Sequence, residues 1–188
     1  MRADLPRVME LLRDVVGYQD PEVLSLYLSE PSPENRFGVG LVAEVDDEVV
    51  GVVAGAGVVL PFTGLAVPAD EITRRIGILD VLGVDPGHRR QGIGARLCDS
   101  LVTQFQDEGW SLMVTKLAAG RHDLVPLYTG WGWKVENPGA GVVVQIGPAT
   151  LAITEDPDAR TAWAPLTSQV RQIPSQIPGI FAVTGMFD

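Results

Sequence analysis

Residues 76–108 constrain the fold more than any other part of the sequence. The segment IGILDVLGV (76–84) is apolar and rich in β-branched residues, which predicts a strand. After the loop DPGHRR, from about residue 92 to 108, apolar side chains recur at helical spacing: Ile93, Leu97, Leu101, Val102 and Phe105. SLMVTKL (111–117) predicts another strand. This order indicates a right-handed crossover between two parallel strands.

The rest of the chain adds helices and antiparallel strands. Helices are expected at residues 4–16, 21–29 and 122–130, strands at 37–45 and 49–60, and a hairpin of GWKVEN and GVVVQIG around Pro138 and Gly139. Low charge indicates that the strands at 37–45 and 49–60 are interior. The pattern predicts an α+β fold, an α/β sandwich whose mixed central sheet has about six to seven strands and about four helices.

The C-terminal part is the least regular in pattern. We expect a core over residues 1–147 and an extension over 148–188. The extension contains Trp163 and Phe181, which favour burial, so we expect it to pack on the core or on a partner subunit. A homodimer remains open.

Composition narrows the classes of partner. The formal net charge is -10 and the pI is about 4.6, which argues against nucleic acid as a partner. The longest apolar run, 49–62, is shorter than the ~20 residues of a membrane span. The single cysteine, Cys98, lies on a helical pattern and is expected in the core. Without metal-ligand spacing we expect no metal, and we expect a cytoplasmic protein that binds neither nucleic acid nor membrane.

A basic, glycine-containing loop predicts an anion site. Arg89 and Arg90 precede Gly92 and Gly94 at the expected start of the helix. Unpaired N–H groups and positive charge at a helix start bind phosphate, especially where glycine allows close approach. The alternative is a solvated arginine pair. Neither the P-loop pattern nor the dinucleotide fingerprint is present, since the latter would need glycine in place of Leu97.

Two motifs carry a resemblance to a known family. RRQGIG, in which Arg89, Gly92 and Gly94 fill the fixed positions of Q/R-x-x-G-x-G/A, resembles the pyrophosphate loop of the GNAT N-acetyltransferase superfamily. Further along, PLYTGWGW (126–133) is similar to the family's later segment of a tyrosine followed by a glycine-aromatic pair. The resemblance covers residues 4–147. The family's first strand is expected to be missing or short here, because the helix pattern starts at about residue 4.

The resemblance implies acetyl-CoA as cosubstrate and direct attack of an amine on the thioester. The backbone of Leu82, Gly83 and Val84 would pair with the pantetheine arm. The residues whose N–H groups would cradle the pyrophosphate are Arg89, Arg90, Gln91, Gly92, Ile93, Gly94 and Ala95. Tyr128 would protonate the departing thiolate, although it could instead be a packing residue. Trp131 and Trp133 are expected to pack, and His88 to face solvent.

The acceptor amine must lose a proton before it attacks. Asp80 lies in an apolar strand, where family members often carry a glutamate, and is a candidate base acting through water. It could instead cap a loop or pair with Arg74 or Arg75. The reserve candidates are Glu44, Asp70, Glu71 and Asp123.

The acceptor class stays open at this point. A small cationic amine, an aminoglycoside-like antibiotic and a protein N-terminus all fit an acidic enzyme, and the connection 61–73 is a candidate wall of the acceptor site. The alternative functions are a non-catalytic acyl-CoA-binding regulatory domain and a nucleotide-binding protein that uses the same loop.

Overall fold

The computed structural model describes residues 5–17, 38–57, 75–146, 149–153, 156–175 and 178–186. The chain divides into two compact units, one made of Met1–Gly57 and Ile78–Asp107, the other of Val58–Gly77 and Glu108–Asp188. The helix expected at 21–29 and the connection 61–73 lie outside the described residues.

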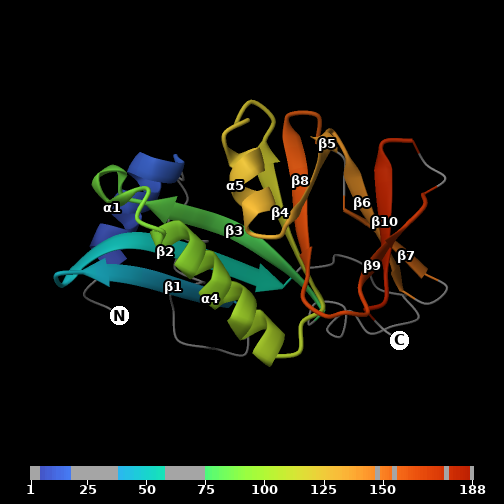
Figure 1. Ribbon diagram of the computed structural model, residues 1–188, viewed down its shortest axis with the longest axis horizontal. Coiled ribbons are helices and arrows are strands. Elements are labelled where there is room, and N and C mark those ends of the chain that lie inside the picture. The colour runs from blue at the N-terminus through green and yellow to red at the C-terminus, as the bar shows by residue number, and fades with distance from the viewer. Residues whose placement is uncertain are drawn as a thin grey trace. The chain divides into compact units, whose positions relative to one another are not determined.

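Figure 1 shows the described helices and strands of the first unit. Its elements are α1 (Leu5–Val16), β1 (Gly38–Val45), β2 (Glu48–Gly57), most of β3 (Ile76–Val84), the 3-10 helix η1 (Pro86–His88) and α4 (Ile93–Asp107). The strand and the long helix predicted from residues 76–108 are therefore confirmed.

β1 and β2 form an antiparallel pair in which Val42 lies opposite Val52, with a register shift between Ala43 and Glu44. Within this unit the sheet order is β1-β2-β3. β1 is thus at the edge among the described strands, so the prediction that both strands of this hairpin are interior is wrong for β1. Local apolar character shows that a strand can be buried, but it does not show which strand has two neighbours.

α1 and α4 pack against alternate residues of β2, as expected for a strand whose successive residues face opposite sides of the sheet. Val52 and Ala54 belong to a buried cluster with α1, whose apolar face includes Val8, Leu11 and Leu12. Figure 1 shows α4 lying along β1 and β2. A Cβ atom on Gly51 would lie 2.9 Å from Leu97 Cδ1 and 3.0 Å from Ile93 Cγ2, so glycine allows α4 to approach closely.

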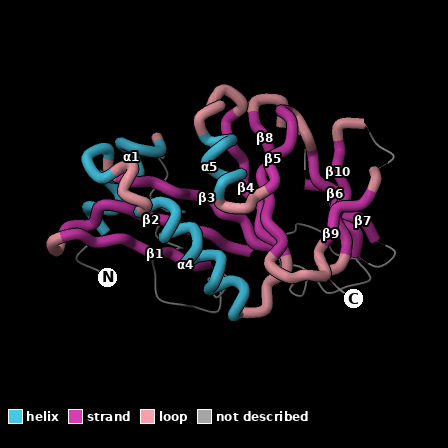
Figure 2. The backbone as a smooth tube through the Cα atoms, in the orientation of Figure 1, coloured by secondary structure: helices cyan, strands magenta, loops and turns pink. Residues whose placement is uncertain are grey.

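The second unit is mostly strand. Its elements are β4 (Leu112–Ala118), α5 (Leu124–Gly130), β5 (Lys134–Pro138), β6 (Gly141–Ile146), β7 (Ala149–Ile153), β8 (Ala159–Pro165), β9 (Arg171–Ile173) and β10 (Ile180–Thr184). β8 lies between β4 and β5 and is antiparallel to both. A separate sheet has the order β7-β6-β10-β9, with β6 and β10 parallel; its tubes run side by side in Figure 2.

Two expectations about this unit are wrong. β5 and β6 do not form a hairpin: β5 pairs with β8, and β6 pairs with β7 and β10. The segment 148–188 is not irregular among its described residues, because it supplies β7 to β10. Its aromatic residues are buried as expected: Trp163 stacks on Phe181 with ring centroids 5.6 Å apart.

Within the two units, helices occur together with antiparallel and parallel strand pairs, which confirms the α+β prediction. The described residues include three α-helices, against about four expected. The boundary proposed between a core over 1–147 and an extension stays a prediction.

Candidate functional site

The loop between β3 and α4, residues 85–92, begins with a side-chain cap. Asp85 Oδ1 accepts a hydrogen bond from the Gly87 N–H at 2.8 Å, and the His88 N–H donates to the Asp85 carbonyl at 2.9 Å. An aspartate before Pro-Gly is a typical start for such a turn. The pKa of the Asp85 carboxyl is below its usual range, first because of the Gly87 N–H and then because of His88.

The β3–α4 loop has an unusual alternation of backbone angles. Arg89 has φ -67°, Arg90 has φ 61°, and Gly92 has φ 77°, whereas Gln91 is not among the described residues with positive φ. Turns that contain left-handed residues can point successive N–H groups toward one bound anion. A non-glycine residue in the left-handed region is uncommon, and such residues concentrate at functional sites.

Helix α4 begins immediately after this loop. Its first intrahelical bond runs from the Arg96 N–H to the Gly92 carbonyl at 3.0 Å. The N–H groups of Ile93, Gly94 and Ala95 precede that bond and point out of the helix start. These N–H groups, with the exposed Arg89 and Arg90, fit a pyrophosphate such as that of an acyl-CoA.

Two arginines in this region bind the protein's own carbonyl groups. Arg89 Nε donates to the Val84 carbonyl at 3.1 Å, and Arg96 Nη1 donates to the Gln91 carbonyl at 3.2 Å. Arg96 was missed by sequence reasoning, although its place four residues after Gly92 puts it on the first turn of α4. Both side chains stabilise the loop from its ends and add positive charge beside it.

His88 does not simply face solvent, contrary to expectation. It is half-buried, and its Nδ1 lies 3.3 Å from Asp85 Oδ1. The short local contact holds the imidazole on the turn that Asp85 caps.

Asp80 lies on the more exposed side of β3. It is exposed, and Leu82 and Val84 on the same side are half-buried, whereas Leu79, Val81 and Gly83 on the other side are buried. The predicted energetic cost of a buried charge therefore does not apply to Asp80. A carboxylate in contact with water can accept a proton through a water molecule, which suits the role predicted for it.

The reserve candidates differ in their surroundings. Glu44 is exposed beside the register shift of β1. Asp123 forms two hydrogen bonds of 2.8 Å with Arg121, and this guanidinium lowers the pKa of the Asp123 carboxyl. A paired carboxylate with a lowered pKa is a weaker base, which makes Asp123 the poorer candidate. Asp70, Glu71 and Arg74 lie outside the described residues.

Tyr128 is buried in an aromatic cluster of the second unit. It is 4% exposed, and its ring centroid lies 5.1 Å from that of Trp131 and 5.4 Å from that of Trp133. Trp133 is edge-on to the tyrosine ring, as aromatic pairs prefer. The packing predicted for Trp131 and Trp133 is confirmed, and the two tryptophans restrict the orientation of the Tyr128 ring.

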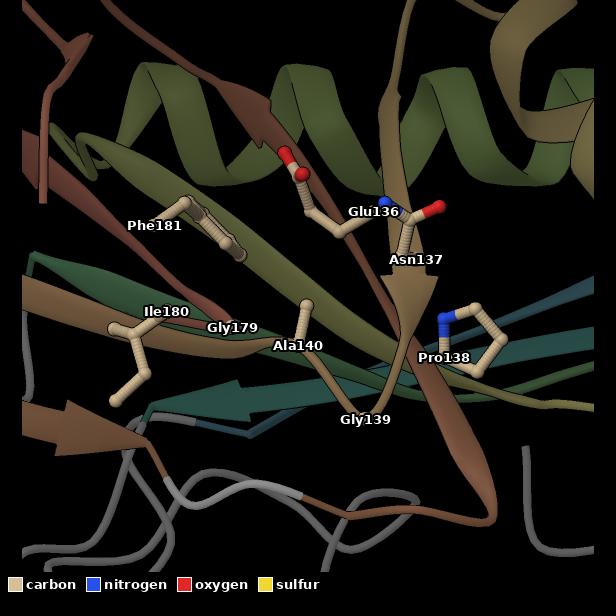
Figure 3. A pocket seen from close by; sticks show the side chains of 8 residues that line it. All are labelled: Glu136, Asn137, Pro138, Gly139, Ala140, Gly179, Ile180 and Phe181. Atoms are coloured by element: carbon tan, nitrogen blue, oxygen red, sulfur yellow. The ribbon is translucent and has the colours of Figure 1, made fainter. Parts of the chain in front are cut away.

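The second unit also has a hollow of about 280 Å³ where β5 ends and β10 begins (Figure 3). It is lined by Glu136, Asn137, Pro138, Gly139, Ala140, Gly179, Ile180 and Phe181. Glu136 Oε1 accepts a hydrogen bond from Trp163 Nε1 at 3.0 Å. None of the site residues predicted from the sequence lines this hollow.

The described residues were also compared with the requirements of a metal site, a reactive cysteine and a membrane-spanning helix. Across the described ranges, no group of three or more His, Cys, Asp and Glu side chains could hold a metal ion. Cys98 is 1% exposed on α4, which confirms its place in the core. No helix in the described part of the chain has the length and apolar character needed to cross a membrane.

Comparison with known proteins identifies the class of protein. Residues 5–133 match the model of the Acetyltransferase (GNAT) family. The chain therefore belongs to the GNAT acetyltransferase family, whose members use an acyl-CoA as cosubstrate. No curated protein matches the sequence.

Solved structures share the fold at low sequence identity. The ribosomal-protein-S18-alanine N-acetyltransferase of Escherichia coli is 14% identical with a TM-score of 0.58, over 94% of this chain and 93% of that one. The ribosomal-protein-alanine N-acetyltransferase of Brucella melitensis is 20% identical with a TM-score of 0.61, over 88% and 96%. Aminoglycoside 6'-acetyltransferase type Ii is 17% identical with a TM-score of 0.58, over 93% of both.

Proposed function

We propose that this protein transfers an acetyl group from acetyl-CoA to a primary amine by direct attack of the amine on the thioester. Family membership supports acyl-CoA-dependent N-acetyl transfer in general. The observation that carries the proposal is the β3–α4 loop, where φ alternates in sign through Arg90 and Gly92 immediately before the unpaired N–H groups of α4. This backbone fits a pyrophosphate, which the donor contains.

Two neighbouring segments of the chain bind the donor in this proposal. The N–H groups of residues 89–95 bind the pyrophosphate, and Arg89 and Arg90 lower the electrostatic cost of placing it there. The backbone of Leu82, Gly83 and Val84, which follows Asp80 along β3, binds the pantetheine arm. When bound, the donor supplies an activated acetyl group on sulfur.

The proton transfers are assigned to two side chains. Asp80, exposed on β3, receives the proton of the acceptor ammonium group through water. Tyr128 donates its hydroxyl proton to the departing thiolate, and its fixed orientation among tryptophans supports this role. The first transfer gives the amine nitrogen a free electron pair for its attack on the thioester. The second neutralises the negative charge on the departing sulfur.

The acceptor is proposed only as a primary amine, a small molecule or a peptide. Its cationic form would suit the formal net charge of -10. The similar structures act, by their names, on a ribosomal-protein alanine and on an aminoglycoside. An acceptor panel should therefore contain peptides with N-terminal alanine, aminoglycosides and simple diamines. The homodimer and the cytoplasmic location stay predictions.

The test is turnover measured as thiol release from acetyl-CoA across this panel. We expect product with at least one amine, and Tyr128→Phe should lower kcat by about ten-fold or more because general acid catalysis typically contributes at least that much. CoA affinity should change little, since the aromatic ring stays in its cluster. Thr129→Ala, an exposed neighbour on α5, is the matched control and should behave as wild type.

The other outcomes separate the alternative functions. A wild-type protein that binds CoA but acetylates no amine of the panel would be a non-catalytic acyl-CoA-binding domain. A melting temperature that rises with ATP and not with CoA would show a nucleotide-binding protein, because a ligand of the folded state raises that temperature. Either result contradicts the proposed enzyme.

A further inference from the structure

Arg7 on α1 connects three elements of the first unit. Its Nη2 lies 3.2 Å from Asp85 Oδ2 and 3.0 Å from Glu48 Oε1. Its Nε donates to the Val49 carbonyl at 3.4 Å, and its Nη1 donates to Glu10 Oε2 at 3.0 Å. One guanidinium thus links α1 to the start of β2 and to the first residue of the β3–α4 loop.

Asp85 transmits this contact to the loop. One carboxylate oxygen faces Arg7, while the other accepts the Gly87 N–H at 2.8 Å and lies 3.3 Å from His88 Nδ1. The Asp85 N–H in turn donates to the Val50 carbonyl at 2.8 Å. Asp85, the first residue after β3, is therefore fixed by its main chain to β2 and by its side chain to α1.

We propose that Arg7 is a positioning residue for the acyl donor: by holding the Asp85 carboxylate, it sets the course of the β3–α4 loop and so the affinity for CoA. The inference rests on the proposed function, because it takes the loop to be the pyrophosphate site. Neither Arg7 nor Asp85 is assigned a contact with the donor. Their effect is on the geometry of the N–H groups at residues 89–95.

The partly buried position of the pair makes the effect measurable. The Arg7 side chain is 31% exposed and that of Asp85 is 25% exposed, so water screens the pair less than it screens a fully exposed one. By contrast, Glu10 is 54% exposed and contributes to the Arg7 contacts from the solvent side. Of these two ion pairs, the one between Arg7 and Asp85, at the loop, is therefore better shielded from water than the one between Arg7 and Glu10.

The test is calorimetric titration of the full chain with CoA. We expect Arg7→Gln to weaken CoA binding about five-fold and Asp85→Asn about ten-fold, on the order of the upper range for ion pairs and charge-assisted hydrogen bonds. If Arg7 acts through Asp85, the double variant should bind about as weakly as Asp85→Asn alone, because coupled residues are not additive. Arg7→Lys, which keeps the charge, should recover part of the affinity.

Arg13→Gln is the matched control. Arg13 is an exposed arginine of the same helix, so its loss changes the net charge by the same amount without touching the loop. It should leave CoA affinity within about two-fold of wild type. In turnover assays Arg7→Gln should raise the KM for acetyl-CoA more than it lowers kcat, since it touches neither reacting group.

The possible outcomes distinguish failure of the proposed function from failure of the positioning role. If wild type does not bind CoA, the proposed function fails and the inference fails with it. If wild type binds CoA and folded Arg7→Gln binds equally well, the positioning role alone is wrong. Additive losses in the double variant, or an equal loss in Arg13→Gln, would show a general charge effect and would also overturn the role. Should Arg7→Gln not fold, Arg7→Lys and Asp85→Asn give the same comparison.

Discussion

Gly92 offers a direct test of the backbone at the start of α4. It has φ 77°, and among the described residues a Cβ atom there would meet only Arg96 Nη1, at 3.4 Å, which is an ordinary contact. Gly92→Ala therefore introduces no clash, and its effect comes from the left-handed backbone alone. An L-residue in that conformation costs about 1–2 kcal/mol. For a chain of this size the melting temperature should fall by roughly 2–8 °C.

The same substitution should weaken donor binding. Alanine favours negative φ, so the peptide groups around residue 92 rotate and the alternation that begins at Arg90 is lost. Amides that converge on one anion would then diverge. We expect CoA affinity, measured by calorimetric titration, to fall by about ten-fold, as for the loss of one or two hydrogen bonds to a charged group.

Gly109→Ala is the control for backbone strain. Gly109 has φ 83°, and its Cβ would meet no described residue within 4 Å, so the substitution carries the same conformational cost away from the loop. Both variants should lose similar thermal stability, but only Gly92→Ala should lose CoA affinity. If Gly92→Ala binds CoA as wild type does, the backbone cradle is refuted. If it melts with wild type, the requirement for a left-handed residue is refuted.

Three further predictions concern stability. Arg90→Gly should raise stability by up to about 1 kcal/mol, because glycine accepts φ 61° without strain, while weakening CoA binding several-fold through loss of charge; melting and titration curves check both. Leu101→Ala, at a fully buried position of α4, should cost about 2–5 kcal/mol in urea unfolding, whereas the exposed Thr103→Ala should stay within about 0.5 kcal/mol. The pKa of Asp85 is lowered in the fold, so its ionised form stabilises the protein above the ordinary carboxyl pKa of about 4, and this contribution disappears as the pH falls through the folded pKa. The melting temperature of wild type should consequently drop more between about pH 6 and about pH 2 than that of Asp85→Asn.

Local patterns predicted the elements of the first unit well. The apolar run at 76–84 and the helical spacing of Ile93, Leu97 and Leu101 correspond to β3 and α4, since both signals depend on residues close in sequence. The sequence also predicts that the loop binds an anion, because Arg89 and Arg90 lie close to Gly92 in the chain. The left-handed φ of Arg90 was not predicted, since arginine gives no sequence signal for it.

The sequence did not predict which distant strands pair with one another. Pro138 and Gly139 are typical turn residues, which favoured a hairpin, yet β5 and β6 belong to different sheets. β8 reaches its neighbour β4 from 45 residues further along the chain at Lys116 and Thr161. Arg7 likewise meets Asp85 across 78 residues. Such contacts depend on topology, which hydrophobic periodicity within one segment does not specify.

We propose that the main chain at the start of α4 binds the pyrophosphate of an acyl-CoA. The most direct test of this proposal is a titration of the protein with CoA followed by heteronuclear NMR of assigned backbone amides. If the main chain binds the pyrophosphate, the amide signals of Arg89 to Ala95 should shift most, in proportion to occupancy, and that of the exposed Gly17, distant in sequence, should not shift. Saturable CoA binding that leaves the amides of residues 89–95 unshifted would contradict it.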